Sequence, residues 1–430
     1  MAYWLVGYSF AYGGDNADGP KTFIGWGNPL LTGNVDYSIN YAFWFFQFAF
    51  ACAVSSIVAG TVAERCKMSA YLCFSVFLVG FVYPVVSHAY WSANGFLSTF
   101  SSDPLWGQGI IDLAGSGPVH MTGGVAALAG SIVIGPRRGR FYDEAGNPLA
   151  EPLEIPPHSV ALQFLGTFAL WFGWYGFNPA SVLVTSTRVA GNVASLVAVN
   201  TTLAAASAAL SAMFTSSAID SWKTGIVTYD LTMTMNGCLT GLAAITAPCA
   251  SVEPWWAVVI GIIAGWVYIF GSWALIKLRI DDCVDAVPVH MLGGLWGDWS
   301  AGLFSSPTLL ANAYPNSAHA GWFYNGSDFT LMGIQLIGTL FVFGWTFSVM
   351  FVFFWVLKYF NLLRIDALEE EVGMDLSFHK NAAYDINSVK KEFVDELVLR
   401  RSSHGTSAKL PAMPKVETVE VTTEVPQSTA

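Results

Sequence analysis

The chain has 430 residues, of which 54% are hydrophobic and only 11% are charged. Soluble domains carry about 25% charged residues, so this composition excludes an ordinary soluble enzyme and indicates a polytopic helical membrane protein. The net charge of −11 identifies no partner, and no basic patch of the kind that binds nucleic acid is present. The six cysteines show no CxxC spacing, so we expect neither a disulfide framework nor a metal site, and we expect no cofactor.

The apolar segments, taken in chain order, predict an all-α fold. About 20 apolar residues cross a bilayer as a helix, so the first apolar run, residues 2–12, is too short to cross. With that run, nine longer ones predict about ten membrane segments: 37–62, 68–91, 112–135, 158–182, 190–214, 229–249, 254–277, 285–305 and 329–360. The sequence after about residue 386 is polar and typical of a disordered tail.

The loop charges predict the orientation. Ten lysines and arginines fall in one set of alternate loops and only two in the other. Basic loops remain in the cytoplasm, so the first set and the C-terminal tail are predicted to be cytoplasmic. The loop 306–328 is then external, and it contains a glycosylation sequon at Asn325.

One heptapeptide occurs twice, as PVHMTGG at 118–124 and as PVHMLGG at 288–294. Each copy opens an apolar segment, and a histidine inside a membrane is costly enough to suggest a function. The repetition indicates an internally repeated transporter or channel in which His120 and His290 share a site. The alternative is two separate histidines, each hydrogen-bonded within its own helix bundle.

Three acidic residues accompany these motifs. Asp112 stands eight residues before His120, where it can cap a helix N-terminus or place a negative charge near a cation path. Asp285 stands five residues before His290 and has the same two interpretations. Asp298 lies in the middle of its segment and invites only a general interpretation, a hydrogen bond to a neighbouring helix or subunit.

Two aromatic residues lie toward the predicted outer ends of their segments, Phe50 and Trp91. Aromatic side chains at this depth are commonly part of the interfacial belt. A more specific interpretation is an aromatic site that attracts a small cation through its π faces, at about 0.5–2 kcal/mol per contact.

Co-linear motifs give the chain a close resemblance to the ammonium transporter (Amt/Mep/Rh) family, and in particular to its Amt branch. The resemblance runs from about residue 3 to 385 and rests on both heptapeptides and on these further motifs: GTVAER (60–65), YPVVSH (83–88), DLAGSG (112–117), GWYGFNP (173–179), Asp281-Asp282 and GMDLSFH (373–379). It implies a membrane domain at 1–365, a cytoplasmic regulatory hinge at 366–385 and a tail at 386–430.

The resemblance also implies a fold and a mechanism. The fold is an inverted five-helix repeat with a long C-terminal helix, assembled as a homotrimer in the plasma membrane. Ammonium is recruited outside at Trp91, with Phe50 in the outer gate and Asp112 in support. The ion then loses its proton, and ammonia passes the twin histidines, His120 and His290.

The sequence differs from the family pattern at several positions. Asn236 is expected at the outer site in place of a serine, and Thr232 in place of a second gate phenylalanine. Lys380 replaces a glycine of the hinge, and Ser377 occupies the position of a phosphorylatable threonine. The family's first helix is expected to be absent, with Met1 inside the equivalent of the second helix.

Three other functions stay open at this point. A Rh-like gas channel is a sister function, although Trp91 and the hinge motif favour the Amt branch. An intramembrane haem protein also uses two facing histidines. A transport-deficient ammonium sensor or regulatory subunit is the third.

Overall fold

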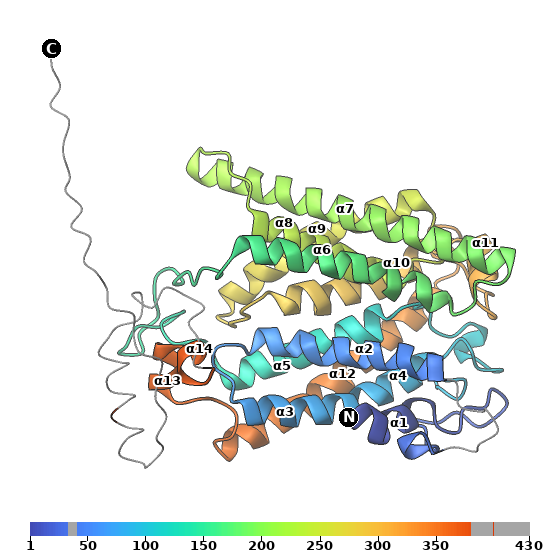
Figure 1. Ribbon diagram of the computed structural model, residues 1–430. Helices are drawn as coiled ribbons and strands as arrows, with labels where there is room; N and C mark the ends of the chain where they lie inside the picture. The colour runs from blue at the N-terminus through green and yellow to red at the C-terminus, as the bar shows by residue number, and fades with distance from the viewer. Residues whose placement is uncertain (33–40, 380–398, 400–430) are drawn as a thin grey trace. The chain divides into compact units, whose positions relative to one another are not determined.

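The computed structural model describes residues 1–32, 41–379 and 399. It divides into two compact units, Met1–Arg364 and Ile365–Ala430. Within the described residues of the first unit the only β pairing consists of isolated bridges, and the helices lie side by side along a common direction (Figure 1). The predicted all-α membrane fold is therefore confirmed.

Among the described residues, the first half of this unit contains four helical segments. A π-helical turn, Tyr3–Gly7, continues directly into α1 (Tyr8–Tyr12) and matches the short first run. The others are α2 (Tyr41–Thr61), a continuous helix made of α3 (Met68–Phe77), the π-turn Leu78–Val82 and α4 (Tyr83–Trp91), and a π-turn at Ser116–Met121 that leads into α5 (Thr122–Ile134).

The second half also contains a π-turn that leads into an α-helix. It comprises α6 (Val160–Phe177), α7 (Arg188–Thr224), α8 (Leu231–Ile245), α9 (Pro254–Lys277), a π-turn at Val287–Leu292 with α10 (Gly293–Phe304), α11 (Pro307–Ala313) and α12 (Thr330–Tyr359). Three 3-10 turns connect helices at Pro29–Leu31, Leu105–Gly107 and Pro179–Val182. The second unit contains α13 (Ala367–Val372) and α14 (Met374–Ser377).

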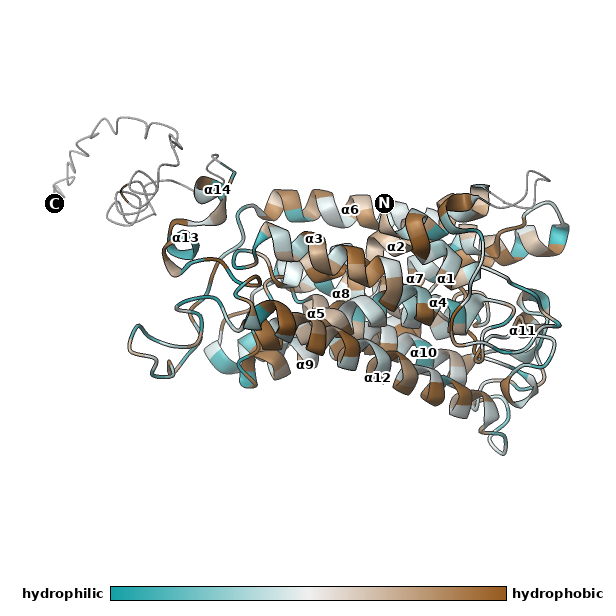
Figure 2. Ribbon diagram, turned by 90° about the horizontal axis from the view of Figure 1, so that it is seen from below, coloured by the Kyte–Doolittle hydropathy of each residue, from teal (hydrophilic) through white to brown (hydrophobic). Residues whose placement is uncertain are grey.

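Among the described residues, seven helices are long and apolar enough to cross a membrane, fewer than the ten segments expected. They are Tyr41–Thr61, Met68–Trp91, Ser116–Ile134, Val160–Val182, Arg188–Thr224, Pro254–Lys277 and Thr330–Tyr359. The expected segment 229–249 forms only the 15-residue α8, because the chain leaves the helix at Thr246. There the carbonyl groups of Thr246 and Ala247 accept the N–H groups of Ala114 and Leu113. Figure 2 shows the apolar colouring concentrated along the helices.

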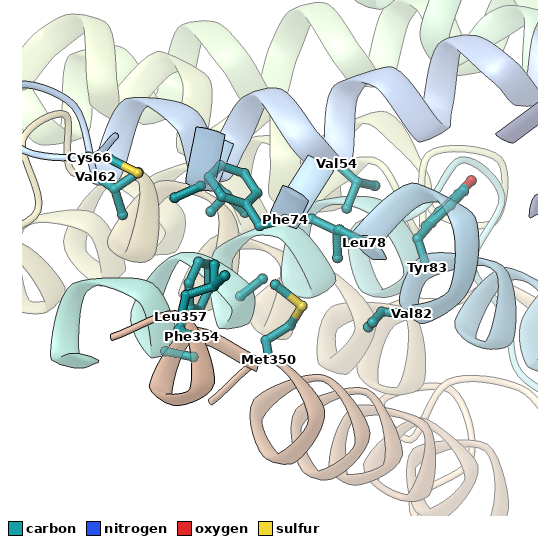
Figure 3. Close-up of a cluster of buried hydrophobic side chains, with 14 of the residues drawn as sticks. Val54, Val62, Cys66, Phe74, Leu78, Val82, Tyr83, Met350, Phe354 and Leu357 are labelled. Atoms are coloured by element: carbon teal, nitrogen blue, oxygen red, sulfur yellow. The ribbon is translucent and has the colours of Figure 1, made fainter. Parts of the chain in front are cut away.

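Two apolar clusters hold the helices together. One joins α2, α3, α5 and α12 through buried side chains that include Val54, Phe74, Met350 and Phe354 (Figure 3). The other joins α7, α8 and α9 through small residues. A Cβ atom on Gly241 would lie 2.5 Å from the Ala208 side chain, so glycine is what permits this close packing.

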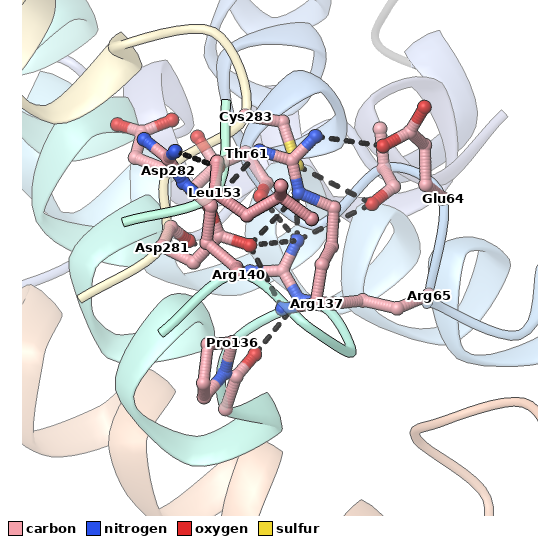
Figure 4. Close-up of polar contacts among 12 residues, drawn as sticks. Thr61, Glu64, Arg65, Pro136, Arg137, Arg140, Leu153, Asp281, Asp282 and Cys283 are labelled. Carbon is pink, nitrogen blue, oxygen red and sulfur yellow. Dashed lines mark hydrogen bonds and ion pairs between the residues drawn. The ribbon is translucent and has the colours of Figure 1, made fainter. Parts of the chain in front are cut away.

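An ionic network ties the predicted cytoplasmic loops together (Figure 4). Arg137 donates to both carboxylate oxygens of Asp281 at 2.8 and 3.0 Å and to Glu64 at 2.7 Å. The fully buried Arg65 donates to the Asp281 main-chain oxygen at 2.7 Å. Burial by itself raises the pKa of Asp281, but the hydrogen bonds and charge of Arg137 outweigh it and hold that pKa below its usual value.

Candidate functional site

The two heptapeptides form matched structures that meet inside the protein. Each one forms a π-helical turn that continues as an α-helix, α5 in the first copy and α10 in the second. His120 Nδ1 lies 3.2 Å from His290 Nδ1, and the two rings are stacked with centroids 5.3 Å apart. At that distance one imidazole carries its proton on Nδ1 and the other accepts it. The structure thus brings together two residues that are 170 positions apart.

The glycines of the heptapeptides explain why the histidines can meet. A Cβ atom on Gly124 would collide with the backbone nitrogen of Met291. Reciprocally, a Cβ atom on Gly294 would lie 2.9 Å from the backbone nitrogen of Met121. Each motif therefore supplies the glycine against which the methionine of the other motif packs, and the two backbones approach closely.

An aspartate caps each π-turn from the same position in sequence. Asp112, eight residues before His120, accepts the N–H groups of Gly115, Ser116 and Gly117 at 2.6, 3.1 and 2.9 Å. Asp282, eight residues before His290, accepts the Val287 N–H at 2.7 Å.

The interpretation of Asp285 as a helix cap is wrong. Its carboxylate accepts the hydroxyl groups of Tyr268 and Ser272, both at 2.9 Å, instead of capping the turn. The backbone of Asp285 has a φ of 57°, and the cap is made three residues earlier, by Asp282.

A row of aromatic side chains leads from Trp91 to the histidines. The Trp91 indole donates to the main-chain oxygen of Asp112 at 2.9 Å and meets the Phe50 ring edge-on at 5.8 Å. Phe50 stacks on Phe177 with ring centroids 4.2 Å apart, and Phe177 lies 5.5 Å from the His120 ring. The structure thus brings Phe50, Trp91, Asp112 and the histidines into one continuous site.

Two members of this site were missed by the sequence reasoning. Phe177 provides the ring that stacks on Phe50, and Trp174 stacks on His120 with centroids 5.1 Å apart. Both belong to the motif GWYGFNP, whose aromatic spacing was the available signal. The expectation that Thr232 replaces the second gate aromatic is wrong, because the partner of Phe50 comes from α6, whereas Thr232 contacts Gln163 at 3.2 Å.

The placement of Asn236 at the outer aromatic end is also wrong. Asn236 donates to the Tyr268 hydroxyl at 3.2 Å, and Tyr268 in turn contacts Asp285. Asn236 lies in the second turn of α8, beside Tyr268 of α9. It therefore lies on the Asp285 side of the histidines and away from the aromatic row.

The geometry of the histidine pair favours a hydrogen bond over axial ligation of a haem. A haem iron held between two axial imidazoles requires about 4 Å between their nitrogens, since the two ligands lie on opposite sides of the iron and each iron–nitrogen bond is about 2 Å. The observed Nδ1–Nδ1 distance is 3.2 Å. The other ring nitrogen of His120, Nε2, is buried and has no hydrogen-bond partner among the described residues, which leaves one polar atom for a small permeating molecule.

Comparison with known proteins decides the family. Residues 1–384 match the model of the Ammonium Transporter Family. The chain belongs to the ammonium transporter family. It is 42% identical to "Putative ammonium transporter 1 member 5" of Arabidopsis thaliana over 396 residues, which cover 89% of this chain and 76% of that protein. It is 36% identical to "Ammonium transporter 3" of Dictyostelium discoideum, with 89% and 83% covered.

Solved structures of the family have the same fold as this transporter. Saccharomyces cerevisiae Mep2 matches with a TM-score of 0.71 at 28% identity, covering 85% of this chain and 77% of that chain. A protein described as "Sensor Amt Protein" also matches with a TM-score of 0.71, at 31% identity, covering 88% and 86%. The transporter is thus a multi-pass membrane protein of the Amt branch.

Proposed function

We propose that this chain transports ammonium across a membrane by recruiting the ion at the aromatic end of the site and passing ammonia along the histidine pair. The observation that carries the proposal is the pairing of His120 with His290 at the end of the row formed by Trp91, Phe50 and Phe177. An aromatic row attracts a small cation, and a neutral imidazole pair suits a neutral molecule.

Recruitment begins at the aromatic end of the site, where the ring of Trp91 and the negative charge of Asp112 both attract a cation. The Trp91 indole is oriented by its hydrogen bond to the Asp112 main chain. The Asp112 carboxylate is buried directly behind it, so its field acts on a cation at the aromatic end. The stacked rings of Phe50 and Phe177 then separate this end from the histidines and act as the outer gate.

Deprotonation follows from the cost of taking an ion into the dry interior. Desolvation of a bare cation costs many kcal/mol, whereas ammonia pays far less. The unpaired Nε2 of His120 offers a hydrogen bond at this point, and the Nδ1–Nδ1 contact links the two imidazoles for sharing or moving a proton. The net species transported depends on where the released proton goes.

The larger assembly is part of the proposal. Matched π-turns and matched capping aspartates support an inverted repeat of two halves. We infer a homotrimer in the plasma membrane, with lipid as the remaining neighbour. In support, the lone chain exposes an apolar face of α6 that includes Leu165, Phe168 and Phe172. No nucleic acid is expected among its partners.

Three further expectations stay predictions. The division into a membrane domain at 1–365, a hinge at 366–385 and a tail at 386–430 is one, and the tail and Lys380 lie outside the described residues. A regulatory role of Ser377 is another. The third concerns the family's first helix: comparing uptake of the 430-residue chain with that of a chain extended upstream by one helix tests whether that helix is needed for transport.

A transport-deficient sensor is the second candidate function. It is favoured by the likeness to the protein described as "Sensor Amt Protein". The two functions differ in turnover, because a sensor binds ammonium without moving it at a comparable rate.

One experiment separates these functions. The purified protein is reconstituted into liposomes, and uptake of labelled methylammonium is measured beside binding of methylammonium in detergent. Transport predicts saturable uptake that falls at least tenfold in His120→Ala, with protein-free liposomes as the baseline. Saturable binding together with uptake at that baseline would instead identify a sensor.

A further inference from the structure

A second buried carboxyl group lies beside Asp112, and the transport steps described above do not use it. Asp298 is in the middle of α10 and is fully buried. Its carboxyl group and that of Asp112 both border Gly117, whose N–H donates to Asp112 Oδ2 at 2.9 Å. A Cβ atom on Gly117 would lie 2.5 Å from Asp298 Oδ2, so glycine is what lets the two carboxyl groups come together.

Two carboxyl groups in contact within a dry interior cannot both be ionised. Each charge would lose its hydration, and the two like charges would repel at short range in a low dielectric. Such pairs hold one proton between them and carry a single negative charge.

The hydrogen bonds indicate which residue carries the proton. Asp112 accepts three backbone N–H groups, which favour its ionised form. Asp298 accepts the Tyr90 hydroxyl at 3.2 Å and shares the Gly117 N–H with Asp112, and no N–H or O–H donor among the described residues reaches its Oδ1. An ionised Asp298 would therefore be poorly stabilised, whereas a protonated Asp298 can donate to Asp112.

We propose that Asp298 is a positioning residue, a neutral carboxylic acid whose O–H donates to the ionised Asp112 and fixes one negative charge behind the aromatic row. Asp298 acts through Asp112, and its hydrogen bonds among the described residues reach neither the aromatic row nor the histidine pair. Its effect on recruitment rests on the proposed ammonium transport, but the shared proton does not.

Among the described residues, no lysine or arginine acts on the pair, so this charge is not compensated by a cation. Tyr90 of α4 contacts Asp298, and Cys249 and Tyr314 lie within electrostatic range of Asp112. Tyrosine and cysteine are neutral near pH 7. From α12, the uncharged Gln335 donates to the Asp298 main-chain oxygen at 3.0 Å. A cation at the aromatic end is thus attracted by the single negative charge that Asp112 and Asp298 carry together.

Infrared difference spectroscopy tests the protonation state without any transport. The spectrum of purified Asp298→Asn is subtracted from that of the wild-type protein at neutral pH. We expect the difference to contain the carbonyl stretch of one protonated carboxylic acid, shifted by deuterium exchange. A difference confined to the carboxylate bands would show that Asp298 is ionised and would overturn the proposal. Tyr90→Phe is the matched control, in which the acid band should persist at an altered frequency.

Uptake kinetics test the positioning role. Asn in place of Asp298 keeps an N–H donor for Asp112, so its KM for methylammonium should stay within about twofold of the wild-type value. Leu in place of Asp298 removes that donor, and KM should rise about tenfold while the folded protein yield is checked by size-exclusion chromatography. Equal KM values for the Asn and Leu variants would overturn the role. Absence of uptake by the wild-type protein, with the acid band present, would refute the proposed transport and leave the shared proton standing.

Discussion

Gly124 lies directly against the backbone of Met291, so that even a methyl group at this glycine would collide with the other half of the protein. The reciprocal contact joins Gly294 to Met121. This crossing sets the distance between the two heptapeptide segments and hence the distance between the two imidazoles. The repeated heptapeptide is therefore a packing motif as well as a pair of histidines.

A larger residue at this crossing should separate the two helices. We expect Gly124→Val to destabilise the protein by about 1–3 kcal/mol, the usual cost of overpacking, and to abolish the histidine contact. Thermal unfolding in detergent measures the first effect and methylammonium uptake the second. Gly344→Ala is the control, because a Cβ atom there meets nothing within 4 Å. Equal stability of the two variants would mean that the crossing can relax freely.

Loss of one imidazole should leave its partner with a buried unpaired nitrogen. Replacement of His290 by Leu removes the 3.2 Å contact to His120, whose Nε2 already has no partner in the described part of the chain. An unsatisfied buried polar group costs about 1–3 kcal/mol, so uptake should fall about tenfold or more. His319→Gln, in the predicted external loop, serves as the control and should transport normally. Wild-type rates in His290→Leu would remove the histidine pair from the mechanism.

The indole of Trp91 should contribute to recruitment more than to turnover. In Trp91→Leu the cation loses one π face, worth about 0.5–2 kcal/mol, which corresponds to a KM raised about 2- to 30-fold. Concentration-dependent uptake separates KM from the maximal rate. Trp91→Phe keeps a π face and should have an intermediate KM. An unchanged KM in the Leu variant would return Trp91 to the interfacial belt.

The Arg137–Asp281 ion pair should make the stability of the protein depend on pH. The pKa of Asp281 is lower in the folded protein than in the unfolded chain, so its stabilisation is present above about pH 4 and is lost as the pH falls through the folded-state value. Removing one partner of a buried pair costs about 3–5 kcal/mol, so Asp281→Asn should unfold at a lower temperature at neutral pH.

Thermal unfolding of Asp281→Asn across the acidic range checks this expectation. The variant should approach the wild-type protein as the pH falls. Asp18→Asn, at an exposed loop position, is the matched control and should follow the wild-type curve. If the difference in unfolding temperature between Asp281→Asn and the wild-type protein grew as the pH fell, it would have the wrong sign for this ion pair.

A phosphate at Ser377 should reduce transport if the hinge regulates the pore. Ser377 is the last residue of α14, and its side chain is buried. A phosphate adds about −1.5 to −2 charge, which a buried position does not tolerate. Ser377→Asp should therefore lower uptake, whereas Ser377→Ala should preserve it. Full transport by the Asp variant, with normal expression, would speak against a regulatory role.

The sequence by itself determined the membrane class, most helix positions and the identity of the paired histidines. These features are written in local patterns, namely apolar run length, loop charge and a heptapeptide copied without loss of its histidine. Asp112 and Trp91 were also found in this way. Asp112 opens the motif DLAGSG, and Trp91 lies three residues after the motif YPVVSH.

Only the tertiary structure decided which distant residues complete the site. Phe177 became the partner of Phe50, and Asn236 moved to the Asp285 side, because these assignments depend on how α6 and α8 pack against the first half. Asp298 had no interpretable role in the sequence, since eight residues past His290 it lies on another face of the helix. Its position next to Asp112 arises only from the crossing of the two heptapeptides, which is fixed by glycines that leave no room between the two backbones.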